Sequence, residues 1–204
     1  MTGFSPVILA FCAAAYILGA IPSGYIIGKV FYGVDLKTVG SGNIGATNAY
    51  RVLGAKAGLS VFLCDFFKGV LAVYLGGLGG NEFAMVLCAL FVIVGNDWSV
   101  FLHFKSGRGV ACGVGAFACL WPPAALGAFL VWLVIFLCTK IVSLSSICAA
   151  PVVPLVIFFM DGPMEFTLFG ALAAAVIIFK HKDNIGRLLR GEEKKITHEK
   201  RPSR

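Results

Sequence analysis

The stretch "FSPVILAFCAAAYILGAIPSGYIIGKVFYGV", Phe4 to Val34, decides what kind of fold this chain can adopt. It contains one charged side chain, Lys29, and it exceeds the about 20 apolar residues that cross a bilayer as a helix. It is too long for the apolar core of a signal peptide, and no basic residue precedes it. We therefore predict a first membrane helix near residues 4–32, which Pro22 and Gly24 can bend.

The rest of the chain is equally apolar. Of its 204 residues, 59% are hydrophobic and 13% are charged, and the mean hydropathy is +0.91. We predict an all-α fold: a polytopic integral membrane helical bundle of about seven transmembrane helices. Hydropathy places the helices near residues 4–32, 56–78, 82–104, 108–120, 122–141, 145–160 and 164–180. The fourth and sixth segments are short, so a count of five or six spans is the alternative.

We expect residues 1–204 to form a single transmembrane domain, with a bundle over residues 1–180 and a basic tail over residues 181–204. Many of the 25 glycines lie inside the spans, and we expect them to let helices pack closely. Examples are Gly113, Gly115 and Gly127. The seven cysteines are scattered through apolar segments without a CxxC pair, so they indicate neither disulfides nor a metal site.

The charges give an independent test of the seven-span arrangement. It places all 17 Lys and Arg residues on the side of the C-terminus, whereas the opposite loops carry Glu82, Asp161 and Glu165 and no basic residue. Such a bias marks the basic side as cytoplasmic. The net charge of +7 then faces anionic lipid headgroups, and it implies no nucleic-acid partner. Asp65 and Lys68, three residues apart on a helix, are expected to neutralise each other.

Three polar clusters interrupt the apolar chain, and the predicted topology places all of them on the basic side. They are "GSGNIGATNAYR" (Gly40–Arg51), "GNDWSVFLHFKSGRGVA" (Gly95–Ala111) and "KHKDNIGRLL" (Lys180–Leu189). A smaller one, "SLSS" (Ser143–Ser146), lies at the same level. The Walker spacing GxxxxGK[ST] is absent, and "GSGNIG" (Gly40–Gly45) taken alone is a weak signal.

The clusters combine groups that bind phosphate. Glycine-rich turns ahead of helix starts present free N–H groups to an anion. Arg51, Lys105 and Arg108 add positive charge, and His181 can exchange a proton near neutral pH. Neutral hydrogen-bonding groups come from Ser41, Asn43, Thr47, Asn48, Ser143, Ser146 and Asn184. Cations at helix ends often only anchor to headgroups, and Ser or Asn often only cap helices. Three such clusters on one side favour a phosphate site with acid–base chemistry.

The same clusters resemble the signature of the bacterial acyl-phosphate:glycerol-3-phosphate acyltransferases. "GSGNIGATNAYR" is similar to the family's GSGN-[IV]-GATN-x-x-R, "FLHFKSGRGVA" to FLxFKGGKGVA, and "HKDNIGRLLRGEE" to HRxNIxRLLxGxE. "IVSLSSI" resembles a YVSLxSI stretch. There are three departures: Asn96 stands where the family usually has histidine, Ser106 replaces a glycine, and Arg108 replaces a lysine. Arg108 keeps the charge but presents a planar fork.

The resemblance implies that an acyl group moves from acyl phosphate to the sn-1 hydroxyl of glycerol 3-phosphate. The products would be 1-acylglycerol 3-phosphate (lysophosphatidate) and phosphate, in the first step of phospholipid biosynthesis. It implies no cofactor or metal, and no partner beyond these two substrates and membrane lipid. The enzyme would lie in the bacterial cytoplasmic (inner) membrane, with its active site and C-terminus facing the cytoplasm.

The implied catalytic residues are His181, Asn184, Arg51 and Ser41. The implied substrate-binding residues are Gly42, Asn43, Asn48, Lys105, Gly107, Arg108, Ser143 and Ser146. The base is either His181 or the donor's own phosphate. Two other classes remain open on the residues alone: a transporter or scramblase-like protein for phosphorylated solutes, and a non-catalytic membrane scaffold.

Overall fold

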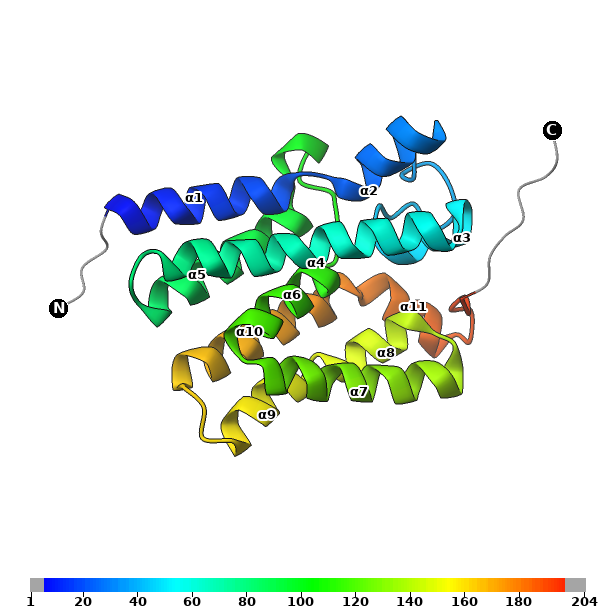
Figure 1. Ribbon diagram of the computed structural model, residues 1–204. Helices are drawn as coiled ribbons and strands as arrows, with labels where there is room; N and C mark the ends of the chain where they lie inside the picture. Colours follow the sequence, from blue (N-terminus) through cyan, green and yellow to red (C-terminus); the bar gives the residue numbers. More distant parts are fainter. Residues whose placement is uncertain (1–5, 197–204) are drawn as a thin grey trace.

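The computed structural model describes residues 6–196, and every regular element in that part of the chain is helical (Figure 1). The first apolar stretch forms α1 (Pro6–Ala20), α2 (Ser23–Ile26) and a π-helical turn (Ile27–Phe31). The following elements are α3 (Ala46–Leu53), α4 (Ala55–Gly77), α5 (Glu82–Asp97), a 3-10 turn (Val100–Leu102), α6 (Val110–Leu120), α7 (Pro122–Thr139), α8 (Val142–Ala149), α9 (Val152–Phe159), α10 (Met164–Lys180) and α11 (Lys182–Leu189).

Each of the seven predicted apolar segments has a helical counterpart. Five are long and apolar enough to cross a bilayer: Pro6–Phe31, Ala55–Gly77, Glu82–Leu102, Pro122–Thr139 and Val142–Phe159. A sixth is reached if α10 and α11, which bend by 59° where they meet, form one span. The remaining segment, α6, has 11 residues and is too short to cross alone. The prediction of an all-helical membrane bundle is confirmed, with about seven helices as an approximate count.

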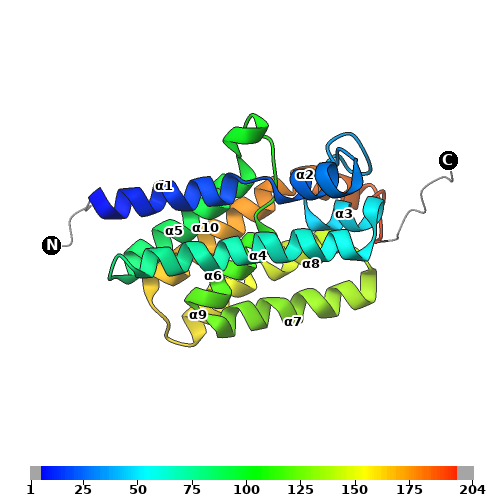
Figure 2. The ribbon, with the colours of Figure 1, turned by 45° about the horizontal axis from the view of Figure 1, so that its top comes forward.

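The short helix α6 lies inside the bundle, against α4 on one side and α7 on the other (Figures 1 and 2). Two glycines allow the backbones of α4 and α6 to touch. A methyl group on Gly115 would overlap the carbonyl oxygen of Phe66, and one on Gly69 would overlap that of Cys112. Close packing through small residues is the means of helix association that lipid permits. The expected packing role is confirmed for Gly115.

The same role is wrong for Gly113. A methyl group there would meet only the side chains of Ile93 at 3.7 Å and Ile177 at 4.0 Å, which is ordinary van der Waals contact. Gly113 instead lines a cavity. The two glycines sit on different faces of α6, and the sequence gives no sign of which face meets a neighbouring backbone.

The first span breaks at Pro22, as its sequence allows, and two distant side chains satisfy the carbonyls at the break. Ser99 Oγ donates to Ala20 O, and Lys68 Nζ donates to Ile21 O. Lys68 also pairs with Asp65 at 3.0 Å, which confirms the predicted i,i+3 pair. Lys68 does not lie at the basic surface, however. It belongs to α4 and is buried in the bundle, at 7% exposure. Backbone groups freed inside lipid need such internal partners.

At the C-terminal end, the predicted tail begins with a helix. Residue 180 ends α10, as the predicted boundary has it, but α11 follows directly and bends back over the bundle (Figure 1). The chain then runs extended, and Ile196 N donates to Lys140 O at 2.7 Å. The part of the predicted tail beyond residue 196 lies outside the described residues.

Candidate active site

A cavity of about 790 Å³ opens at the end of the bundle where α3 and α11 lie, and all three polar clusters reach it. It is bounded by α3, α4, α6, α7, α8, α10 and α11. Ten of the twelve predicted site residues line it: Ser41, Asn43, Asn48, Arg51, Gly107, Arg108, Ser143, Ser146, His181 and Asn184. The other two, Gly42 and Lys105, are exposed and are not among its lining residues.

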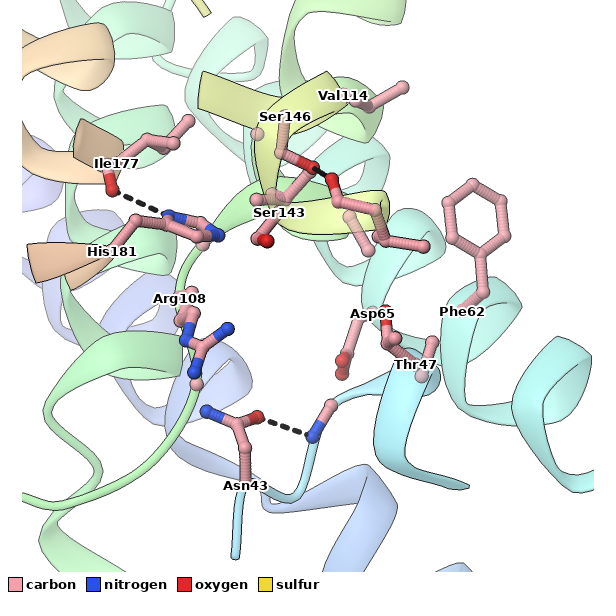
Figure 3. A pocket seen from close by; sticks show the side chains of 18 of the residues that line it. Asn43, Thr47, Phe62, Asp65, Arg108, Val114, Ser143, Ser146, Ile177 and His181 are labelled. Carbon is pink, nitrogen blue, oxygen red and sulfur yellow. Dashed lines mark hydrogen bonds between the residues drawn. The ribbon is translucent and has the colours of Figure 1, made fainter. Parts of the chain in front are cut away.

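Figure 3 shows how the polar groups are arranged around this space. His181 and Arg108 lie on one side of it and Thr47 and Asp65 on the other, with Asn43 below. The "SLSS" segment belongs to α8, and its Ser143 and Ser146 lie across the space from Asn43 (Figure 3). Segments separated by more than a hundred residues in sequence therefore share one site.

The glycine-rich loop before α3 is held in shape by Asn48. Its Oδ1 accepts a hydrogen bond from Ser41 N at 2.8 Å, and its Nδ2 donates to Leu36 O and Val39 O, both at 3.1 Å. Gly40 has φ +63° and lies so close to Asn48 that any side chain at position 40 would collide with it. Although Asn48 lines the cavity, its amide is committed to the loop, so it shapes the site through the loop backbone.

Arg51 follows on the next turn of α3 and is also buried, at 8% exposure. Its Nη2 donates to Lys194 O at 3.1 Å, so the guanidinium connects α3 to the segment that follows α11. A buried guanidinium carries its charge permanently and offers a fork of donors to a phosphate.

The second cluster forms a loop, residues 103–109, that α5 supports. Gly107 N donates to Asn96 O at 2.9 Å, and a side chain at position 107 would collide with Asn96. Gly109, with φ +69°, then starts α6 and leaves Arg108 facing the cavity. Burial lowers the pKa of Arg108 from its usual value, and the nearby charge of Arg187 acts in the same direction. Asn96, where the family usually has histidine, serves here to position this loop.

His181 stands at the bend between α10 and α11 and is buried, at 2% exposure. Its Nδ1 lies 2.7 Å from Ile177 O (Figure 3). A carbonyl oxygen only accepts, so Nδ1 carries the proton and Nε2 of the neutral ring keeps its lone pair. The ring edge bearing Nε2 faces the cavity, as expected for a group that accepts a hydrogen bond or a proton from a ligand.

Asn184, one turn into α11, offers a second acceptor. Its Nδ2 donates to Glu193 Oε1, whereas its Oδ1 is buried and has no hydrogen-bond partner in the described part of the chain. A buried amide oxygen without a donor costs free energy, which a ligand hydroxyl in the cavity would recover. His181 and Asn184 thus present two acceptors to the same space.

Glu193 is a cavity residue to which the sequence analysis assigned no role. Its carboxylate accepts hydrogen bonds from Ser143 Oγ at 2.7 Å, Arg187 Nε at 2.6 Å and Asn184 Nδ2. Burial raises the pKa of Glu193, but the hydrogen bonds from Ser143, Arg187 and Asn184 outweigh it, and the net shift is downward. Its position as the last residue of "HKDNIGRLLRGEE" was the sequence feature that could have pointed to a role for Glu193. Nothing local in the sequence distinguishes a buried glutamate from a solvated one.

A bundle of apolar, membrane-length helices around a cavity that joins cationic and amide groups to apolar walls defines an integral membrane protein whose cavity suits an amphiphilic, phosphate-bearing molecule. Comparison with known proteins narrows this class. A family model described as "Glycerol-3-phosphate acyltransferase" matches residues 9–191. The chain is 45% identical to glycerol-3-phosphate acyltransferase 2 of Moorella thermoacetica, over 89% of this chain and 94% of that protein. It is 45% identical to the glycerol-3-phosphate acyltransferase of Trichlorobacter lovleyi, over 92% and 97%.

Two crystal structures agree with the fold. The glycerol 3-phosphate form of PlsY (YgiH), an integral membrane glycerol 3-phosphate acyltransferase, superposes with a TM-score of 0.88 at 40% identity, covering 93% of this chain and 96% of that one. Its lysophosphatidic acid form gives a TM-score of 0.86 at 39% identity, covering 92% and 94%. The chain belongs to the glycerol-3-phosphate acyltransferase family, and it is a membrane-bound acyltransferase.

The buried carboxylate of Glu193 yields a pH-dependent prediction. Glu193→Gln should lower the Tm at pH 7 by roughly 3–10 °C, because charge-assisted hydrogen bonds from Arg187 and its neighbours are lost. Since the pKa of Glu193 is lowered in the folded protein, its stabilisation is fully present above its usual value of 4.5 and is lost as the pH falls through the lowered pKa. The Tm difference between wild type and variant should therefore shrink below that pH, measured by thermal unfolding in detergent.

Glu192→Gln is the matched control. Glu192 pairs with Arg190 at 2.7 Å, but both side chains are more than half exposed, so this change should leave the Tm within a degree or two. Equal effects of the two substitutions, or a Tm difference for Glu193→Gln that does not depend on pH, would contradict the assigned role of Glu193.

Proposed function

We propose that the protein transfers a fatty acyl group from acyl phosphate to the 1-hydroxyl of glycerol 3-phosphate. The hydroxyl oxygen attacks the acyl carbonyl carbon, the bond between that carbon and the phosphate oxygen breaks, and inorganic phosphate leaves. The hydroxyl proton ends on the released phosphate, so the equation balances without a cofactor or metal. The products are 1-acylglycerol 3-phosphate and phosphate, which makes this the first acylation of phospholipid synthesis.

The observation that carries the proposal is that the cavity has a polar, cationic end and apolar walls. Its polar end gathers Arg51, Arg108, His181 and Asn184, whereas its other walls are apolar. Between α4 and α7 it is bordered by side chains that are partly exposed on the lipid-facing surface, Leu59 and Phe62 on α4 and Phe129 and Trp132 on α7. An acyl phosphate in the membrane can bring its phosphate to the polar end while its tail stays among apolar groups.

The two arginines suit the phosphates. Arg51 and Arg108 approach the cavity from different elements, so one can hold the acceptor's phosphate while the other faces the donor's. The positive charge of these partly or fully buried groups favours the transition state, in which negative charge builds on the leaving phosphate. We assign Ser41, Asn43, Ser143 and Ser146 to the surrounding hydrogen-bonding shell, and we place Asn48 and Gly107 behind it as positioning residues.

His181 and Asn184 suit the acceptor's hydroxyl groups. In our proposal Nε2 of His181 accepts the hydrogen bond of the attacking hydroxyl, and Oδ1 of Asn184 accepts from the neighbouring one. The proton then reaches the phosphate either directly or through the imidazole. Acyl phosphate is a mixed anhydride with a good leaving group, so direct attack needs no acyl-enzyme.

We further propose that the site and the C-terminus face the cytoplasm of a bacterial inner membrane. The first and third polar clusters lie at the same end of the bundle (Figure 1), the second reaches the same cavity, and the basic residues of these clusters favour the cytoplasmic side. A soluble acceptor would then reach the cavity from the aqueous side, and the donor would reach it from the inner leaflet.

The donor is tested with purified protein in detergent or lipid. We expect acyl phosphate and glycerol 3-phosphate to give lysophosphatidate and phosphate in equal amounts, with no product from acyl-CoA. Arg51→Ala at matched folded protein should lower this rate about ten- to a hundredfold, because a charge-assisted contact to phosphate is lost. Product from acyl-CoA alone, or no product from acyl phosphate, would overturn the proposed reaction.

The role of His181 is tested by a pair of substitutions. His181→Ala should lower kcat about a hundredfold or more at matched folded protein, since the acceptor hydroxyl loses its partner. His181→Gln separates the two proton routes: retention of much of the activity assigns the proton to the donor's phosphate, and a loss as large as that of the alanine variant assigns it to the imidazole. The control is Lys182→Ala, an exposed neighbour that should keep near-normal turnover. Normal turnover in His181→Ala would remove this residue from the mechanism.

The orientation is tested with single cysteines in a background without the seven native ones. Cysteines replacing Ser41, Ser106 and Lys182 should react with a membrane-impermeant maleimide only from the cytoplasmic side. One replacing Asp161, in the loop between α9 and α10, should react only from outside. Labelling of positions 41 and 182 from opposite sides would be incompatible with a single site.

A further inference from the structure

The half of the cavity farthest from the arginines is lined by unusually small residues. Ala125 and Ala128 come from α7, and Gly170, Ala173 and Ala174 come from α10. The three helices around this part, α6, α7 and α10, could each fill the space with larger apolar side chains. An apolar void in a packed interior costs stability, so a space of this kind persists where a ligand fills it. These small residues therefore mark the place of an apolar group that is not part of the chain.

Helix α6 provides one wall and the end of this space. Its residues Val110, Gly113, Val114 and Phe117 line the cavity at helical spacing, so they share one face. Phe117 lies about two turns in from the polar end of the helix and is only 4% exposed. Its ring stacks on that of Phe169, with centroids 5.0 Å apart and planes 23° from parallel. Phe117 lines the cavity, and Phe169 packs against its ring.

Gly113 leaves this wall open. Close helix packing does not require a glycine at that position, because a side chain there would meet only Ile93 and Ile177 at ordinary contact distances. The absence of a side chain instead widens the passage between the polar end and the space above Phe117.

We propose that this deep apolar space holds the acyl chain and that Phe117 is its floor, which sets the longest chain the enzyme accepts efficiently. The proposal rests on the proposed function, since it takes the chain of an acyl phosphate or of the lysophosphatidate product as the occupant. The head of that ligand is fixed by the phosphate site, so the distance from Arg108 to Phe117 limits the chain. The stacked rings of Phe117 and Phe169 resist displacement, because both are buried.

The alternative course for the tail runs sideways, between α4 and α7, into lipid. That opening is bordered by the large side chains Phe62, Phe129 and Trp132, which are partly exposed. No protein group would limit the length of a tail that lies in lipid. The two courses therefore predict different dependences of the rate on chain length. Each methylene that loses its place in an apolar site should cost about fourfold in kcat/KM.

Two substitutions on α7 raise the floor by different amounts. Ala125 lies near the start of α7, and Ala128 lies about 4.5 Å closer to the polar end along the helix axis. Ala125→Leu should disfavour the longest chains, and Ala128→Leu should shift the preferred length further down. Phe117→Leu should act oppositely and improve the use of the longest chains relative to wild type. Ala175→Leu, on the exposed face of α10, adds the same bulk outside the cavity and should leave the preference unchanged.

The measurement is a competition among acyl phosphates of 12, 14, 16 and 18 carbons, with the ratio of the four lysophosphatidates as readout. Because a ratio is scored, partial loss of folded protein does not mimic the effect. A second readout is the Tm increase produced by lysophosphatidates of the same four lengths. Shifts in both series, in the order Ala125→Leu then Ala128→Leu, support the floor; unchanged ratios and unchanged Tm series in both variants overturn it.

The two proposals fail differently. If acyl phosphate gives no product with any chain, but Tm increases still depend on chain length and shift in the Ala128→Leu variant, the proposed donor is wrong and the floor stands. If all four chains are transferred and all variants keep the wild-type ratios, the reaction stands and the tail runs into lipid.

Discussion

In lipid, every backbone group that a broken helix sets free must find a partner inside the protein, and this constraint governs the fold. At Pro22 the carbonyls of Ala20 and Ile21 accept from Ser99, which follows α5, and from Lys68 of α4. At the bend near residue 181, Ile177 O accepts from the backbone N of His181 and lies 2.7 Å from its Nδ1. Buried polar side chains therefore lie beside both breaks. Those same buried groups hold α5, α4 and α11 where the cavity needs them.

Two cations that line the cavity, Arg51 and Arg187, are held in place by the segment that follows α11. Arg51 is bonded to the carbonyl oxygen of Lys194, and Glu193 accepts from Arg187, Ser143 and Asn184. A buried charge with no counterion would be costly, so the end of the chain stabilises the positive site. Groups already fixed in position need little reorganisation when negative charge appears on a ligand, which is the condition for effective electrostatic stabilisation. The last described residues are therefore part of the site, although they lie beyond the last helix.

The placement of the cavity also follows from a short helix. With 11 residues, α6 cannot cross the bilayer, and it is enclosed by α4, α5, α7 and α10. One of its faces packs backbone to backbone on α4 through Gly115, and another faces the cavity through Gly113 and Phe117. A single helix thus connects the arginine-bearing loop before it with the apolar interior, as the proposed transfer from a lipid donor to a soluble acceptor requires.

The sequence by itself determined the membrane class, the apolar segments, the Asp65–Lys68 pair and the convergence of the polar clusters. These properties depend on local sums and short spacings: about 20 apolar residues per span, three residues between ion-pair partners, and the bias of Lys and Arg to one side. The motif resemblance led to the family for the same reason, since motifs are local. Only the tertiary structure decided which polar residues face the cavity. Asn48 turned inward to its loop, Gly42 and Lys105 turned away from the cavity, and Glu193 joined it, because each outcome depends on contacts between residues far apart in the chain, such as Arg51 and Lys194.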